Sequence, residues 1–175
     1  MYSVQYNFYI NISRRGITMK PYNKNFVFQE MKRYNKLISS GTCGNYKIIK
    51  NIIKKQNLCG YMYENKEDYN IDVIGLYKNN INLMQLTPKE IESAYGVIHF
   101  AYGRVGIVGL GIGYVVQEIA KRCDVQEIIV YEISEDVIKL YNSNFEANEK
   151  IKILNEDAFK AKSDKFDFFY VDIYK

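Results

Sequence analysis

Three glycines at alternate positions constrain the fold of this chain more than any other feature of its sequence. They are Gly109, Gly111 and Gly113. An apolar run over 105–108 precedes them, and a helical pattern that begins at Tyr114 follows. A backbone without Cβ atoms can turn sharply and lets a ligand approach the main chain and the helix N-terminus. A glycine loop between a strand and a helix therefore predicts the first unit of a parallel α/β fold.

After the glycine loop, strand and helix patterns alternate. Strands buried on both faces read as continuous apolar runs, and helices in the connections imply parallel, right-handed crossovers. We therefore expect an α/β fold with an incomplete Rossmann-like parallel sheet of about four strands. Its predicted elements are strands over 105–108, 127–131, 151–154 and 166–171, a helix over 114–122, and a helix that Ser134 caps and that reaches about Glu146.

A smaller α+β region is expected before the sheet. A helix is predicted over 26–38, whereas the isoleucine pairs within 46–55 fit a short amphipathic helix at least as well as a strand. Two β-rich segments, 72–77 and 81–86, flank a Lys-Asn-Asn turn at 78–80. Since asparagine tolerates left-handed turn conformations, this pattern predicts a β-hairpin.

The helix that precedes the glycine loop has the clearest predicted boundaries. Thr87 is the N-cap, Pro88 the first helical residue and Glu90 the acid of a capping box. The helix should run to about Tyr102 and stop at Gly103. The chain thus divides into a poorly ordered or non-native tail (1–18), an N-terminal helix and hairpin region (19–86) and a truncated Rossmann-like domain (87–175).

The glycine spacing and the acid that follows the second strand indicate the class of ligand. Glu132 ends that strand, where a carboxylate can accept hydrogen bonds from both ribose hydroxyls of an adenosine group. A dinucleotide fingerprint would have glycine or alanine three residues after Gly111, where this chain has Tyr114. The third glycine, Gly113, comes one position earlier.

This G-x-G-x-G form at 109–113 resembles motif I of the class I S-adenosylmethionine-dependent methyltransferases. The resemblance implies that the three glycines cradle the methionine part and ribose of the cofactor and that Glu132 holds the ribose. It places Asp157, with Ala158 beside it, at the adenine amine. Asp172, which ends the fourth strand, matches the position near the reacting centre and is the candidate catalytic residue.

Within this superfamily the chain also resembles the spermidine synthase branch, the polyamine aminopropyltransferases. That resemblance rests on the predicted hairpin and on the run 83–87, which leads into the next helix. The chain departs from the branch because 93–97 lacks its Tyr-His-Glu, and because the second acid of its Asp-x-x-Asp loop would fall after Lys175. Ile107 also stands where methyltransferases often carry an acid.

Three functions remain open from these features. The first is a transferase that binds S-adenosylmethionine or its decarboxylated form, with a small-molecule acceptor of unknown identity. The second is a catalytically silent, methyltransferase-like module that binds a partner. An NAD-dependent oxidoreductase is third, because Tyr114 disfavours it. The resemblance implies the family's strand order, 3-2-1-4, in which the fourth strand would be an apolar edge, so we expect a homo-oligomer, a covering N-terminal segment or an incomplete product of a longer gene.

Charge and composition limit the kinds of partner that the chain is expected to bind. The first 60 residues carry eleven Lys or Arg and one acid, whereas the rest carry thirteen bases and nineteen acids. Such a basic arm is compatible with nucleic acid, but a solvated or subunit-facing surface is favoured because no recognition motif accompanies it. No apolar run approaches the roughly 18 residues that span a bilayer, and the first residues, apolar and then Arg14 and Arg15, reverse the charge order of a secretory signal, so we expect a cytoplasmic protein. Three scattered cysteines and one histidine, His99, predict no metal site.

Overall fold

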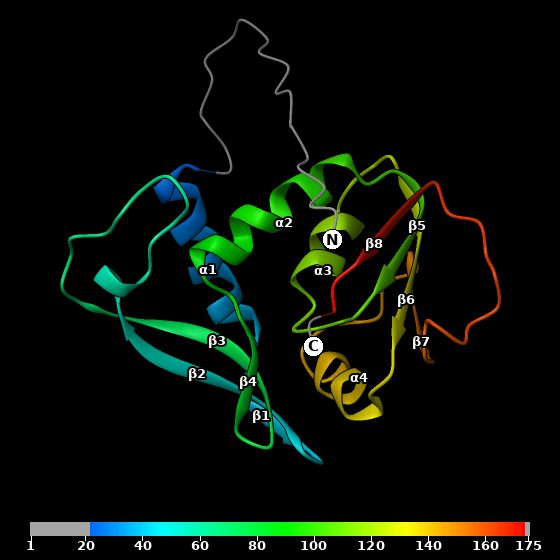
Figure 1. The fold of residues 1–175 in the computed structure, drawn as a ribbon, viewed down its shortest axis with the longest axis horizontal. Coiled ribbons are helices and arrows are strands. Elements are labelled where there is room, and N and C mark those ends of the chain that lie inside the picture. Colours follow the sequence, from blue (N-terminus) through cyan, green and yellow to red (C-terminus); the bar gives the residue numbers. More distant parts are fainter. Residues whose placement is uncertain (1–21, 174–175) are drawn as a thin grey trace, which may run out of the picture.

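A computed structural model describes residues 22–173, so the predicted tail over 1–18 lies outside the described residues. Two sheets flank a layer of helices (Figure 1). One is antiparallel with the order β1-β2-β3-β4, and the other is parallel with the order β7-β6-β5-β8. The predicted α/β class, the hairpin region and the 3-2-1-4 strand order are confirmed. The elements are α1 (Lys24–Leu37), β1 (Gly41–Cys43), β2 (Tyr46–Lys54), η1 (Lys55–Asn57), β3 (Asn70–Lys78), β4 (Ile81–Gln85), α2 (Pro88–Phe100), β5 (Gly103–Val108), α3 (Tyr114–Ala120), β6 (Val125–Glu132), α4 (Glu135–Asn142), β7 (Ile151–Asn155) and β8 (Phe168–Val171).

The segment whose type the sequence left open is strand β2. It pairs antiparallel with β3 along its whole length, from Tyr46 opposite Lys78 to Lys54 opposite Asn70. The isoleucine pairs fit either periodicity, so the pairing with β3, which satisfies the backbone groups of both strands, decides the conformation. The hairpin turn then reverses the chain through Asn79 and Asn80, whose φ angles are +49° and +66°.

The helices after the hairpin are shorter than the sequence predicts. Thr87 caps α2 as expected, but the helix ends at Phe100 because Gly103 already enters the parallel sheet and donates its N–H to the Asp124 carbonyl at 2.8 Å. The next helix, α3, stops at Ala120. The fourth helix, α4, also stops early, at Asn142, because two polar side chains that follow it bond back to a carbonyl of its last turn. In α4, hydrogen bonds from side chains to the backbone thus end the helix earlier than the sequence pattern predicts.

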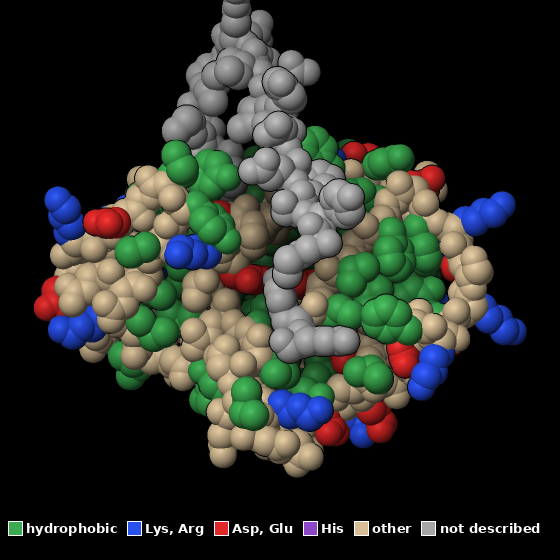
Figure 2. Space-filling view, viewed as in Figure 1, with side chains coloured by type: hydrophobic (Ala, Val, Ile, Leu, Met, Phe, Trp, Pro, Cys, Tyr) green, Lys and Arg blue, Asp and Glu red, His purple; other side chains and the backbone are tan. Residues whose placement is uncertain are grey.

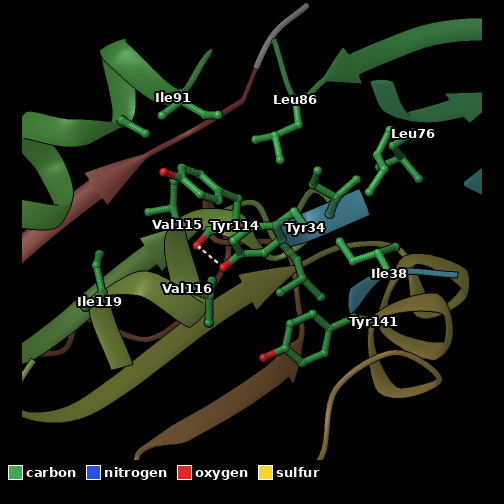
Figure 3. Packing of buried hydrophobic residues seen from close by; sticks show 14 of the residues in the cluster. Tyr34, Ile38, Leu76, Leu86, Ile91, Tyr114, Val115, Val116, Ile119 and Tyr141 are labelled. Atoms are coloured by element: carbon green, nitrogen blue, oxygen red, sulfur yellow. Dashed lines mark hydrogen bonds between the residues drawn. The ribbon is translucent and has the colours of Figure 1, made fainter. Parts of the chain in front are cut away.

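A buried tyrosine joins the N-terminal region to the parallel-sheet region. Tyr34 on α1 is 0% exposed, and its ring meets Tyr114 on α3 edge to face, with centroids 4.9 Å apart. Its hydroxyl donates to Glu118 Oε1 at 2.5 Å and lies 3.5 Å from the Tyr114 carbonyl oxygen (Figure 3). Burial alone would raise the pKa of Glu118, but hydrogen bonds from Lys121, Tyr34 and Arg33 lower it. The two regions therefore share one core and a charged network.

The basic N-terminal region is partly neutralised within the chain. Its ion pairs reach acids that come later in the sequence: Lys24 to Glu67, Lys54 to Asp68, and Arg33 to Glu118. This pairing leaves less free positive charge than the sequence count suggests.

Strand β8 is the edge of the parallel sheet, as the sequence predicts. Phe169 and Val171 are 51% and 52% exposed. Figure 2 shows hydrophobic side chains gathered on this half of the molecule. The expected self-association stays a prediction, and this edge is where it would occur. Across residues 22–173, no helix has both the length and the apolar character that crossing a bilayer requires.

Candidate functional site

The glycine loop turns by means of left-handed backbone conformations. The φ angles of Gly109, Gly111 and Gly113 are +96°, +53° and +86°. The loop starts at the carboxyl end of β5, where Gly109 N–H donates to the Tyr131 carbonyl of β6 at 2.9 Å. Gly113 then serves as the N-cap of α3. The sharp strand-to-helix turn expected from the sequence is therefore present.

The space that each missing Cβ leaves is occupied by other atoms of the chain. A Cβ on Gly109 would lie 2.4 Å from the Asp172 carbonyl oxygen, and one on Gly111 would lie 2.6 Å from the Met84 sulfur. One on Gly113 would meet the Tyr141 ring at 2.6 Å. A backbone oxygen fills the space at Gly109 and a packed ring fills the space at Gly113. The space at Gly111 is filled by the thioether of Met84, which belongs to a flexible side chain. A ligand can therefore reach the loop backbone at Gly111 only if Met84 changes its rotamer.

Glu132 fixes the glycine loop to the end of β6. Its side chain is buried, at 9% exposure. One carboxylate oxygen accepts the Leu110 N–H at 3.0 Å and the other accepts the Ser134 N–H at 2.8 Å. A carboxylate has about four acceptor positions, so both oxygens keep capacity for a further hydroxyl donor. The predicted ribose-binding residue thus already has a second role, which is to shape the loop.

A small hollow with room for about one water molecule lies against the glycine loop. Besides the loop, Met84 from β4, Glu90 from α2, Tyr114 from α3 and Asp172 after β8 line it. Asp172 is held there because its N–H donates to the Val108 carbonyl of β5 at 2.8 Å. The fold therefore gathers the three predicted glycines and the predicted catalytic acid around one hollow.

The other predicted site residues do not line this hollow. Asp157 starts a turn after β7, where one carboxylate oxygen accepts the Phe159 N–H at 3.0 Å and the other lies 3.5 Å from Lys160 Nζ. Ala158 packs against the sheet face formed by Val108, Ile129 and Tyr131. Asp157 nevertheless follows the strand next to the one that Glu132 ends: Asn155, the last residue of β7, pairs with Glu132 and its Nδ2 donates to the Glu132 carbonyl at 3.0 Å.

Glu90 is a member of the site that the sequence assigned to helix capping. Thr87 Oγ1 does accept the Glu90 N–H, at 3.4 Å, but the Thr87 N–H donates to the Gln85 carbonyl at 2.8 Å. Glu90 is also among the residues that line the hollow. Burial, together with the negative charge of Asp172, raises the pKa of Glu90 to about 7.

The raised pKa of Glu90 makes the stability of the fold depend on pH. Its ordinary value is 4.5, so between about pH 4.5 and 7 the folded chain keeps a proton that the unfolded chain has lost. Stability is therefore full below pH 4.5 and falls as the pH rises through 7. Discounted for partial exposure, the loss is about 1–2 kcal/mol. We expect Glu90→Gln to unfold in urea like the wild type at pH 4.5 and to be more stable by that amount at pH 8.

The matched control for this prediction is Glu149→Gln. Glu149 is an exposed acid that precedes β7, at the opposite end of the parallel sheet from the glycine loop. It should shift the urea midpoint equally at both pH values. If the free energy of unfolding of Glu90→Gln differs from that of the wild type by the same amount at both pH values, the raised pKa of Glu90 is contradicted.

The solved structures that are similar to this chain include a methyltransferase and two spermidine synthases. The 23S rRNA methyltransferase ErmE is 22% identical, with a TM-score of 0.41, over 47% of this chain and 35% of that one. The spermidine synthase from Thermotoga maritima is 18% identical, with a TM-score of 0.45, over 77% of this chain and 47% of that one. A spermidine synthase in complex with the transition-state analogue AdoDATO is 18% identical, with a TM-score of 0.45, over 79% of this chain and 58% of that one. The chain thus spans less than two thirds of each.

No protein-family model matches the sequence, and no curated protein matches it. At these identities and scores, the three similarities assign no activity to the chain. The function has to be argued from the geometry of the site.

Two residues of the hollow, Met84 and Glu90, were missed as site residues from the sequence. Met84 belongs to the second strand of the hairpin and Glu90 to the first turn of α2, and each also has a local role that accounts for it. The only sequence signal is their place just before the glycine unit, since an element that precedes β5 can fold over the carboxyl end of that strand. Within residues 22–173, no three His, Cys, Asp or Glu side chains lie close enough together to hold a metal ion.

Proposed function

We propose that the chain binds S-adenosylmethionine, or its decarboxylated form, at the glycine-loop hollow and acts as a transferase. The observation that carries this proposal is the convergence of three features at the carboxyl end of the parallel sheet. These features are a left-handed glycine loop, a buried carboxylate at Glu132 that fixes the loop, and Asp172 at the end of the adjoining strand. Ligands of open parallel sheets bind outside this edge.

The residues present would suit an adenosyl sulfonium in charge, and the hollow would have to widen to admit it. Glu132 would accept the ribose hydroxyls with its remaining acceptor capacity, and Asp157, in the turn after the next strand, would face the adenine, with Ala158 next to it in the sequence. The loop backbone at Gly111 becomes accessible when the flexible Met84 side chain moves aside. The hollow is narrow as it stands, so this movement is part of the proposal.

Transfer from such a cofactor needs mainly alignment. When bound, the cofactor supplies an activated alkyl carbon on a sulfonium. Asp172 and Glu90 would hold the acceptor nucleophile in line with that carbon and take up the proton that the nucleophile loses. The acceptor's lone pair forms the new bond, and the electron pair of the broken carbon–sulfur bond stays on sulfur.

Isothermal titration calorimetry with S-adenosylmethionine, S-adenosylhomocysteine and decarboxylated S-adenosylmethionine tests the binding claim. We expect Glu132→Gln to bind about 10- to 100-fold more weakly than the wild type, because charge-assisted hydrogen bonds contribute about 1.5–3 kcal/mol. Glutamine keeps the shape of the side chain. Its NH2 group, however, would face one of the two backbone N–H groups whose hydrogen bonds the Glu132 carboxylate accepts, so two donors would oppose each other.

Glu127→Gln is the matched control, because Glu127 lies on the same strand but bonds to Arg104 at 2.6 Å instead of to the loop. It should bind within about twofold of the wild type, since surface ion pairs contribute little. No heat with any of the three compounds, or equal affinity of Glu132→Gln and the wild type, would refute the proposed function.

A second candidate function has one observation in its favour. Atoms of the chain fill the spaces over all three glycines, and the Met84 sulfur lies where a ligand would touch Gly111. A methyltransferase-like module without catalytic activity, which binds a partner, would keep such a closed loop. Cofactor binding without turnover of any offered acceptor would favour this candidate over the transferase.

A further inference from the structure

Helices cover only one face of the parallel sheet among residues 22–173. Figure 1 shows α3 and α4 on the side that faces the antiparallel sheet. On the opposite face, Val108, Ile129 and Tyr131 form a small apolar cluster, and the segment between β7 and β8 packs against it through Phe166. Because parallel sheets are normally covered on both faces, we expect this face to have a further partner.

Two side chains of strand β8 extend this apolar face to the edge of the sheet. Val171 is opposite Val108 of β5, so both point to the same face. The Phe169 ring packs against the Phe166 ring, with centroids 5.3 Å apart. Phe169 and Val171 are each about half exposed, so the described residues bury them only in part.

The backbone of β8 presents hydrogen-bonding groups to the side away from β5. On the β5 side, the Asp172 N–H donates to the Val108 carbonyl at 2.8 Å. Successive N–H groups of a strand alternate in direction, so those of Phe169 and Val171 point to the other side. None of the strands within 22–173 pairs with β8 there. An edge of this kind is a template for a further strand.

Residues 2–12, which precede the described part of the chain, have the pattern of a strand with one apolar face. A period of two is that of a half-buried strand, and the segment contains no glycine, proline or charged residue that would interrupt it. Its apolar side would match the surface that Phe169 and Val171 form. The apolar or aromatic residues at every second position are Tyr2, Val4, Tyr6, Phe8, Ile10 and Ile12, and those between them are Ser3, Gln5, Asn7, Tyr9 and Asn11.

The start of α1 lies close enough to β8 for this segment to reach it. The Phe26 ring, near the start of α1, meets the Tyr95 ring of α2 edge to face, with centroids 6.1 Å apart. From there α2 rises only about 8 Å to its last residue, Phe100, and leads into β5, which pairs with β8. The nine residues 13–21 would link the segment to α1, and they can span up to about 30 Å.

We infer that residues 2–12 add to the parallel sheet as a fifth strand, which pairs with β8 on the side away from β5 and places its apolar side chains beside Phe169 and Val171. Of the expectations for this edge, a covering N-terminal segment is therefore the one that we select, and these residues are ordered instead of forming a loose tail. The strand buries the two half-exposed side chains and pairs the outward backbone groups of β8. No ligand takes part, so the inference is independent of the proposed function.

Hydrogen–deuterium exchange of the full chain, followed by NMR at the amides of Phe169 and Val171, tests the inference. In the wild type we expect both amides to be protected, because the added strand accepts their hydrogen bonds. The double substitution Phe8→Asp and Ile10→Asp places two charges in the apolar contact, where their burial is unfavourable. We expect exchange at both amides to become at least about tenfold faster. The amide of Ile129, on the interior strand β6, is the internal reference and should not change.

The matched control is the double substitution Asn7→Asp and Asn11→Asp. It adds the same charge to the same segment, but on the polar side of the alternation, so we expect exchange at the β8 amides within about twofold of the wild type. Circular dichroism establishes that both variants are folded. A measurement on the wild type alone complements them: size-exclusion chromatography with light scattering should give a monomer, and the protection of β8 should not depend on protein concentration.

Three results would overturn the inference. The first is rapid exchange of both β8 amides in the wild type, which means that no strand pairs there. The second is protection that increases with protein concentration together with the mass of a dimer, which assigns the edge to a second copy of the chain. The third is an equal effect of the two double substitutions, or no effect of either. None of these results bears on the proposed function, which the calorimetric titrations test.

Discussion

Replacing Gly109 by alanine is expected to lower the free energy of unfolding by about 2–5 kcal/mol. Two causes add. A side chain at φ +96° adopts a backbone conformation that L-residues rarely occupy, and the new Cβ would lie 2.4 Å from the Asp172 carbonyl oxygen. That oxygen cannot move away easily, because the Asp172 N–H is bonded to Val108 in the parallel sheet. Urea denaturation, followed by far-UV circular dichroism, measures the loss.

Gly41→Ala is the matched control for this substitution. Gly41 lies in β1, and a Cβ there would meet Leu140 Cδ2 at 3.5 Å, an ordinary van der Waals contact. We expect a change within about 0.5 kcal/mol. Equal destabilisation by the two substitutions would show that the close approach of Gly109 to β8 is not what fixes the loop.

Replacing Tyr34 by alanine is expected to lower the free energy of unfolding by about 3–5 kcal/mol. The side chain is 0% exposed, and its truncation would leave a cavity between α1 and α3 beside the Tyr114 ring (Figure 3). It would also remove the hydroxyl that donates to Glu118. Because the two regions share one core, we expect a single cooperative unfolding transition, with its midpoint at a lower urea concentration than in the wild type.

Tyr34→Phe separates the packing from the hydrogen bond. It keeps the ring and removes only the bond to Glu118, which Arg33 and Lys121 still contact, so we expect a loss of about 1–2 kcal/mol. The division of the chain at 86/87, expected from the sequence, is tested by the same experiment. Two separate transitions, one of which ignores Tyr34→Ala, would show that the regions fold independently.

Strong local signals in the sequence predicted much of the fold. The apolar positions of α1, the Thr87-Pro88 start of α2 and the Asn-Asn turn all appear where expected. Each of these depends on a few neighbouring residues, through helical periodicity, capping or a left-handed turn. The positions of Gly109 and Asp172 at strand ends follow in the same way, because parallel strands end at a common edge.

The site could be predicted only in part, since some of its members come from elements outside the parallel sheet. Met84 and Glu90 each satisfy a local pattern, strand alternation for one and helix capping for the other. Nothing in those patterns indicates that both side chains meet the glycine loop. Their contribution depends on how α2 and the hairpin pack on α3, which is a long-range contact.

The sequence by itself determined the α/β class and the sharp turn at the glycine loop, because glycine spacing, apolar runs and helix caps act over a few residues, whereas the expected strand order came from the family that the chain resembles. Only the tertiary structure decided that residues 46–54 form a strand, that the helices stop early and that Glu90 and Asp172 line the same hollow. The physical reason is that these outcomes depend on partners far away in the chain. A backbone takes the conformation whose hydrogen bonds a neighbouring strand completes, and a carboxyl changes its pKa when another charge is folded against it.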